Sequence, residues 1–140
     1  MGITYKDSGV DIDSAEFGRM IKCHHYCHGD AKRVIDALVG AGIGPERIAL
    51  DPGIGFGKDD DGNLALLAAL PDLATAGHPV LVGPSNKSFI GRLTGAEVTQ
   101  RLPGTLAALW PAVGIDRAVV RVHDASAATQ YLKIATRIRE

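Results

Sequence analysis

The strongest constraint on this chain is an alternation, repeated three times, between a short β-branched run and a longer amphipathic segment rich in Ala and Leu. Each run ends in a polar or glycine-rich turn. Strands that alternate with helices in this way form a parallel sheet. The spacing between runs, about thirty to forty residues, suits a βα barrel and a doubly wound sheet equally. The sequence therefore predicts an α/β fold built from parallel βα units.

The predicted elements follow the chain in a regular order. Strands are expected at residues 47–51, 79–83 and 117–123, and helices at 30–41, 62–76, 89–93, 103–113 and 125–138. Gly42 provides a C-terminal stop for the first helix. The second helix has leucines at helical spacing, namely Leu64, Leu67, Leu70 and Leu73. About three parallel strands cannot close a barrel, so we expect an open sheet whose free edges pair with another chain.

The first 29 residues differ from the rest of the chain, being polar and rich in Gly, Ser and acidic groups. We therefore predict two parts. Residues 1–29 are expected to be an N-terminal segment of different origin, partly disordered, and residues 30–140 an α/β domain.

The charge balance and the number of cysteines limit which binding partners and which cellular compartment are expected. Fifteen basic and sixteen acidic side chains leave a net charge of -1, which provides no field to attract nucleic acid or an anionic membrane. No apolar run approaches the ~20 residues of a spanning helix, and the start lacks the pattern of a secretion signal. With two cysteines, Cys23 and Cys27, we expect a reduced, cytoplasmic location and a small-molecule or protein partner.

A dense group of soft ligands precedes the α/β part. It consists of Cys23, His24, His25, Cys27 and His28. A structural zinc site usually draws its ligands from two separated pairs, and no second pair follows. We predict no functional metal site here, with adventitious metal binding as the alternative.

Chemistry in parallel βα folds is expected just after the strands, at their carboxyl ends. Three segments occupy those places: 51–58 (DPGIGFGK), 83–91 (GPSNKSFIG) and 121–124 (RVHD). In the first, Asp51 ends a strand and alternating glycines let a ligand approach the backbone. A P-loop is excluded because Pro52 and Asp59 stand where its Gly and its Ser or Thr belong, and Lys58 replaces the third glycine of a dinucleotide site. A glycine-rich turn capped by Asp51 is the alternative.

The other two segments carry cations. Lys87 lies between two serines, in a donor-rich loop suited to a carboxylate or an oxo group, or else in a solvated surface loop. Arg121 and His123 alternate along a strand and so share a face. They could bind a diphosphate or serve as partly buried structural groups, and their spacing does not decide between these interpretations.

Four segments, taken together and in this order, are similar to the C-terminal signature of dihydropteroate synthases. They are the DPGIGFGK run, the GPSNKSFIG run with Thr94 and Gly95 after it, the GTLAA stretch at 104–108 and the final RVHD. The resemblance covers residues 30–139. That family is a (β/α)8 barrel, a TIM barrel, and the strands here would be its sixth to eighth. The family reaction is a transferase step of folate biosynthesis that condenses 6-hydroxymethyl-dihydropterin diphosphate with p-aminobenzoate.

The resemblance implies roles for the residues at the strand ends. Asp51 would accept hydrogen bonds from the aminopyrimidine edge of the pterin, and Lys87 would donate to its carbonyl. Arg121 would stack on the pterin and, with His123, hold the leaving diphosphate. The implied catalytic set is Lys87, Arg121 and His123. Within the implied substrate-binding set, Ser88 would contact the p-aminobenzoate carboxylate, and Phe56 and Pro84 would flank its ring. The whole set is Asp51, Gly55, Phe56, Gly83, Pro84, Lys87, Ser88, Arg121 and His123.

Two departures from the family pattern limit this expectation. Asn86 replaces an Arg that the family usually has, which removes a fixed charge. The N-terminal loops that order p-aminobenzoate and the magnesium-bound diphosphate are absent, so magnesium is expected only through the substrate. We expect a pterin-binding fragment that is inactive alone and that forms a homo-oligomer or joins a complementary half-barrel. A structural or chimeric fragment without catalytic function is the alternative.

Residues 5–13 (YKDSGVDID) resemble the N-terminal signature of phosphoribosylformylglycinamidine cyclo-ligase, a purine-pathway enzyme of another fold. The match is short and includes none of that enzyme's catalytic core. It suggests a chimeric chain and carries no function over.

Overall fold

The computed structural model describes residues 21–22 and 28–140. The strands are β1 (Ile21–Lys22), β2 (Leu50–Asp51), β3 (Val80–Val82) and β4 (Ala118–Val120). The helices are α1 (His28–Gly40), α2 (Asp60–Ala68), α3 (Leu70–Ala74), α4 (Ser88–Thr94), α5 (Leu102–Ala108) and α6 (Ala125–Arg139). Short 3-10 turns occupy Pro45–Arg47, Val98–Gln100 and Trp110–Ala112.

Most of the N-terminal segment lies outside the described residues. The predicted boundary at residue 29 and the predicted disorder of that segment therefore stay predictions. The side chains of the Cys and His cluster at 23–28 also lie outside what the structure describes.

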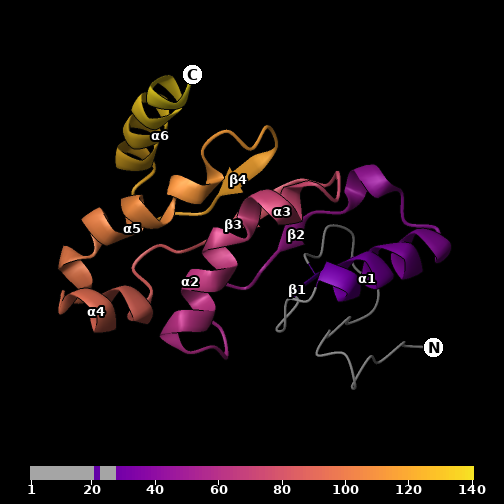
Figure 1. Cartoon of the computed structure of the whole chain (residues 1–140), viewed down its shortest axis with the longest axis horizontal. Helices are drawn as coiled ribbons and strands as arrows, with labels where there is room; N and C mark the ends of the chain where they lie inside the picture. Colours follow the sequence, from indigo (N-terminus) through magenta and orange to yellow (C-terminus); the bar gives the residue numbers. More distant parts are fainter. Residues whose placement is uncertain (1–20, 23–27) are drawn as a thin grey trace.

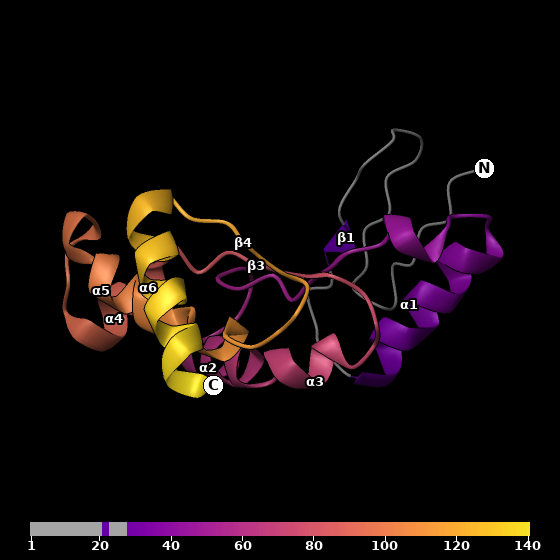
Figure 2. The ribbon, with the colours of Figure 1, turned by 90° about the horizontal axis from the view of Figure 1, so that it is seen from above.

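The four described strands form one parallel sheet in the order β1-β2-β3-β4, which confirms the predicted open α/β architecture. The three predicted strands are β2, β3 and β4. The sheet also contains β1, whose two residues left no pattern in the sequence. Figures 1 and 2 show α1 at one end of the molecule and α4 to α6 at the other, with the sheet between them.

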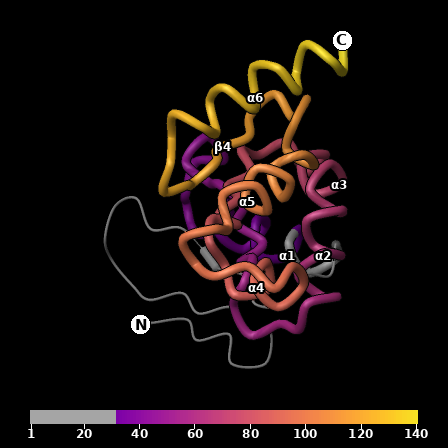
Figure 3. The backbone as a smooth tube through the Cα atoms, turned by 90° about the vertical axis from the view of Figure 1, so that its left-hand side faces the viewer, coloured from indigo at the N-terminus to yellow at the C-terminus, as the bar shows by residue number. Residues whose placement is uncertain are grey.

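One face of the sheet packs against helices. Val80 and Val82 of β3 are 1% and 0% exposed, and they join a core that includes Leu70, Phe89 and Leu109. Figure 3, which looks at the molecule from the side of α4 and α5, shows α2 and α3 along one flank and α6 along the top of the view. Burial of these apolar side chains is the main stabilising contribution to the fold.

The opposite face of the sheet is more open among the described residues. Leu81 and Val119 are in register on neighbouring strands and point away from the helices, because side chains alternate along a strand. Val119 is 49% exposed. Leu50 is in register with Val80, so Asp51, the next residue, lies on this open face.

Proline divides two of the predicted helices. The helix expected over 62–76 is broken at Ala69, just before Pro71, which has no N–H to donate to the preceding turn. Within α2 the buried residues are Asn63, Leu66 and Leu67, whereas Leu64 is 43% exposed. The helix expected over 103–113 likewise ends at Ala108, ahead of Pro111.

Candidate binding site at the carboxyl edge of the sheet

Asp51, at the end of β2, is a buried carboxylate with one satisfied oxygen. The residue is 5% exposed, and Oδ1 accepts a hydrogen bond of 2.8 Å from the backbone N–H of Gly53. Its other oxygen, Oδ2, is buried and accepts no hydrogen bond from the described residues. A buried acceptor without a donor costs free energy, so such an atom is a candidate contact for a donor from a ligand.

The glycine-rich loop that follows Asp51 is held by two side chains. Asn63 of α2 is fully buried, and its Oδ1 accepts from the N–H of Gly55 at 2.6 Å. Lys58 Nζ donates to the carbonyl oxygens of Gly53 and Phe56, each at 2.9 Å. These bonds fix the loop between residues 53 and 58 in a closed shape.

Burial lowers the pKa of the Lys58 ammonium from its ordinary value of 10.5, and the neighbouring Asp51 carboxylate opposes this shift. Burial is the larger of the two effects. The lysine thus gives the loop a cation that is partly withdrawn from water and lies within the electrostatic reach of Asp51.

The loop after β3 meets the loop after β2. Lys87 Nζ lies 3.9 Å from the centroid of the Phe56 ring, within the range of a cation–π contact. A Cβ on Gly55 would lie 2.7 Å from Lys87 Cδ, and Gly55 has φ of +80°. Both observations require glycine at this position, because a larger residue would displace the lysine and strain the backbone.

Asn86, the residue before this lysine, has φ of 55°, a left-handed conformation that Asn tolerates better than most residues. Its N–H donates to Thr105 Oγ1 at 3.0 Å, and its carbonyl accepts from Arg101 at 3.1 Å. The position where the family usually has Arg is therefore anchored at both backbone groups.

The segment after β4 brings two further predicted residues to the same edge. A Cβ on Gly83 would lie 3.0 Å from Nε and Nη2 of Arg121, so the guanidinium passes close over this glycine. Ser85 Oγ lies 2.8 Å from His123 Nδ1 and also accepts from the His123 backbone N–H at 3.1 Å. The ends of β3 and β4 are thus joined by side-chain contacts.

The structure therefore gathers most of the predicted site residues into one connected edge. Asp51, Gly55, Phe56 and Lys87 belong to two loops in contact, and Gly83 contacts Arg121. Ser88 is exposed at the first position of α4. Pro84 is fully buried in this conformation, and its predicted contact with a ligand ring stays a prediction.

Sequence reasoning missed the residues that hold the site in place. Lys58 is only a mismatch to nucleotide motifs, Ser85 has no predicted role in the second loop, and Asn63 lies inside a helical pattern. An Asn within a leucine-rich helix is a weak signal that was available, because Asn is a poor helix former and needs partners when buried.

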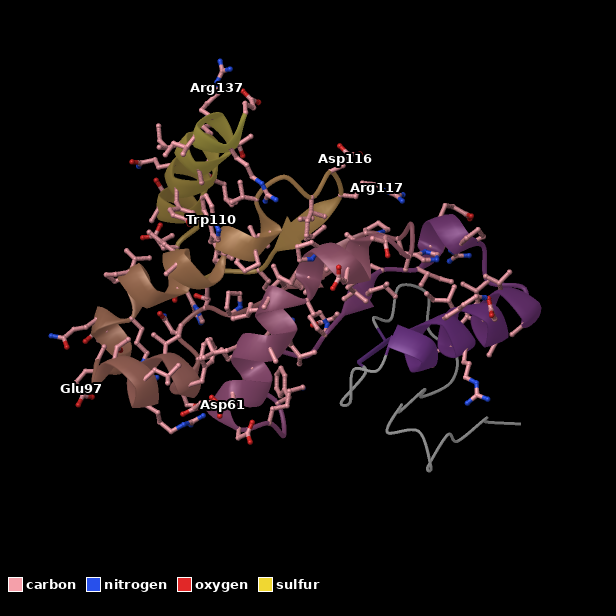
Figure 4. All side chains as sticks on the ribbon, viewed as in Figure 1. Asp61, Glu97, Trp110, Asp116, Arg117 and Arg137 are labelled. Carbon is pink, nitrogen blue, oxygen red and sulfur yellow. The ribbon has the colours of Figure 1, made fainter. Side chains whose placement is uncertain are left out.

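A groove of about 420 Å³ lies at the opposite, amino-terminal edge of the sheet. Arg117 donates there to the carbonyl of Gly77, and Arg139 donates to that of Val113. The C-terminal ends of α3 and α6 border the groove, and helix ends of this kind carry partial negative charge. The two cations of the groove, Arg117 and Arg139, therefore stabilise the fold. Figure 4 shows Arg117 at the turn before β4 and Arg137 near the end of α6.

The described residues include no group of three or more His, Cys, Asp or Glu side chains that could hold a metal ion. Nor does any helix in this part of the chain have the length and apolar character needed to cross a membrane.

A buried carboxylate and two cations, gathered where parallel strands end, define an α/β protein with a small-molecule site at the carboxyl edge of its sheet. Comparison with known proteins gives the family. Residues 12–123 match the family described as pterin binding enzyme. The chain belongs to this family.

Its relatives include dihydropteroate synthases. The enzyme of Neisseria meningitidis serogroup B is 47% identical over 114 residues, which cover 76% of this chain and 40% of that protein. The inactive dihydropteroate synthase 2 of Mycobacterium tuberculosis is 33% identical over 157 residues, covering 95% of this chain and 49% of the relative. The structure of a Coxiella burnetii dihydropteroate synthase in complex with pteroic acid superposes with a TM-score of 0.74 at 37% identity.

That superposition covers 80% of this chain and 43% of the Coxiella protein. The chain thus spans less than half the length of each of these three relatives. The family match begins within the segment 1–29, and β1 lies there as well. The resemblance of residues 5–13 to the cyclo-ligase finds no support in these matches and stays a prediction.

We predict that Lys58→Met lowers the free energy of unfolding by about 1–2 kcal/mol, because two loop carbonyls lose a charged donor while the apolar stem is kept. Chemical denaturation at neutral pH measures the change. Lys133→Met, at an exposed position of α6, is the matched control and should leave the stability nearly unchanged. Equal stability of the two variants would contradict the clamping role.

The difference in stability between the unmodified chain and Lys58→Met is also expected to depend on pH. Because burial lowers the pKa of Lys58 in the folded chain, the unfolded chain binds this proton more tightly. The cost of burying the charge is present at neutral pH and is relieved as the pH rises toward 10.5. The free energy of unfolding of the unmodified chain should therefore increase relative to that of Lys58→Met in this range. A constant or shrinking difference would show that Lys58 is not desolvated.

Proposed function

We propose that this chain forms the pterin-binding part of a dihydropteroate synthase site. The observation that carries the proposal is Asp51 Oδ2, a buried oxygen at a strand end that accepts no hydrogen bond from the described residues. The aminopyrimidine edge of a pterin offers two adjacent N–H donors, the arrangement that a carboxylate accepts well. The pteroic acid complex of the Coxiella relative supports this ligand class.

The neighbouring residues take complementary roles in the proposal. Lys87, held over Gly55 and beside the Phe56 ring, donates to the pterin carbonyl. Arg121, lying over Gly83, stacks on the pterin and supplies positive charge to the diphosphate together with His123.

A second subsite is proposed for p-aminobenzoate. Ser88, exposed at the start of α4, contacts its carboxylate, and the half-buried Phe56 flanks its ring. Pro84, predicted to flank the ring as well, is buried in this conformation, so its contact requires movement of the loops, as that of Asp51 does.

Access to Asp51 requires movement of the glycine-rich loop, because Oδ2 lies inside the protein in this conformation. Gly53, Gly55 and Gly57 all have positive φ, between +62° and +80°. Glycines interconvert between backbone conformations at little cost, so this loop is suited to open and close over a bound pterin. Lys58 and Asn63 define its closed form.

The family chemistry joins the pterin methylene to the amine of p-aminobenzoate as diphosphate departs. Its demands are leaving-group stabilisation and positioning, which Arg121, His123 and Lys87 suit better than base catalysis. Magnesium is proposed only as a companion of the diphosphate, since the described residues offer no group of three ligating side chains, and no step here depends on it. We propose pterin binding without turnover until the rest of the family site is supplied.

Asp51→Ala is expected to reduce the affinity for a dihydropterin at least tenfold, because a buried carboxylate that accepts two hydrogen bonds contributes about 2 kcal/mol or more. Calorimetric titration of the chain with 6-hydroxymethyl-dihydropterin measures this. Asp61→Ala removes an exposed carboxylate at the start of α2, labelled in Figure 4, and should bind like the unmodified chain. Equal affinity in all three proteins would refute the role of Asp51.

We also propose that the open face of the sheet is covered by the remaining strands of the family fold. That face carries Val119, which is 49% exposed, and it is the face on which Asp51 lies. Outer strand β4 has no further strand beside it among the described residues, and an unpaired parallel edge invites pairing. The relatives, more than twice as long as the matched region, contain the additional chain needed to cover it.

The expected partner can be tested with the part of the Neisseria meningitidis enzyme that this chain does not match. Sedimentation of the mixture should show a one-to-one complex, which Val119→Asp disrupts by placing a charge in the contact. Ile138→Asp, at an exposed position of α6, is the control and should leave the complex intact. A complex of two copies of this chain in place of the mixed one would instead assign the face to self-association.

A further inference from the structure

Ser85 and His123, which are 38 residues apart in sequence, make two contacts that together set the direction of a hydrogen bond. The backbone N–H of His123 can only donate, so Ser85 Oγ accepts this bond of 3.1 Å. The second contact, 2.8 Å between Ser85 Oγ and His123 Nδ1, can run either way, because the tautomer of the ring is not fixed by distance.

Counting donors and acceptors resolves the direction. Ser85 is buried at 9% exposure, and its hydroxyl has no acceptor other than His123 Nδ1 among the described residues. If Nδ1 carried the proton, the serine hydroxyl would accept twice and its own O–H would lack an acceptor. If the serine donates to Nδ1, the serine hydroxyl, Nδ1 and the backbone N–H of His123 are all satisfied, as buried hydroxyls require.

We propose that Ser85 is a positioning residue that holds His123 as the neutral tautomer protonated at Nε2. His123 is exposed, and its Nε2 has no hydrogen-bond partner among the described residues. Its N–H is therefore available to a ligand beside Arg121, so that the arginine supplies charge and the histidine supplies a directed donor. This role rests on the proposed function only in naming the ligand, an oxyanion of the diphosphate class.

The tautomer can be measured without any ligand. Nitrogen-15 correlation spectra of the histidine rings at about pH 8, above the ordinary pKa of histidine, distinguish a protonated ring nitrogen from an unprotonated one. His123 should show an unprotonated Nδ1 and a protonated Nε2. Ser85→Ala should shift the ring toward a mixture of tautomers, and Ser85→Thr, which keeps the hydroxyl, should restore the original signals. A protonated Nδ1 in the unmodified chain would overturn the proposal.

A second readout tests the consequence for binding, with inorganic pyrophosphate as the probe. Ser85→Ala should weaken its binding by about three- to tenfold, the loss expected for one misdirected hydrogen bond, while Ser85→Thr stays near the unmodified affinity. Ser126→Ala, at an exposed position of α6, is the matched control and should change neither readout. Unchanged binding in Ser85→Ala would overturn the positioning role.

The two readouts separate two kinds of failure. If the unmodified chain shows the expected tautomer but binds no pyrophosphate, the direction of the Ser85 bond stands and the proposed diphosphate subsite fails. If pyrophosphate binds but Nδ1 carries the proton, the subsite stands and the role of Ser85 fails.

Discussion

The register between the parallel strands is the constraint on which the rest of the structure depends. Pairing of Val80 with Leu50 on one side and Ala118 on the other aligns the ends of β2, β3 and β4. The same register sends the valines of β3 into the helical core and leaves Asp51 on the opposite face. A shift of one residue would exchange these faces, burying polar groups in the core and exposing the valines. The core and the candidate site are therefore fixed by one set of backbone hydrogen bonds.

The site combines side chains that pass close to glycine backbone with side chains that hydrogen-bond the loops. Gly55 and Gly83 leave room for the side chains of Lys87 and Arg121 to cross the backbone. Lys58, Asn63 and Thr105 then bond the loop backbones, so that loops without regular structure still hold defined shapes. Among the described residues, Asp51 Oδ2 is a buried acceptor without a donor, and such an atom is where a ligand has most to contribute.

Much of this arrangement could be predicted from the sequence, because periodicity and strand-end residues are local signals. They gave the parallel open sheet, the segments that reach its carboxyl edge and, through the motifs, the family. Other features could not be predicted from the sequence, for physical reasons. β1 is two residues long, too short for a pattern. Pro71 divides the helix expected over 62–76, and Leu66 is buried while Leu64 is exposed. The bond between Ser85 and His123 joins residues 38 apart, which no local pattern can show.

The central claim is that the carboxyl edge receives a pterin through Asp51, and a crystal structure of the chain with a dihydropterin bound tests it most directly. The account predicts that the aminopyrimidine edge donates to Asp51 Oδ2, with the loop at 52–58 displaced and Lys87 beside the pterin carbonyl. A ligand bound at the opposite edge beside Arg117 and Arg139, with the loop closed and Oδ2 still lacking a donor, would contradict it.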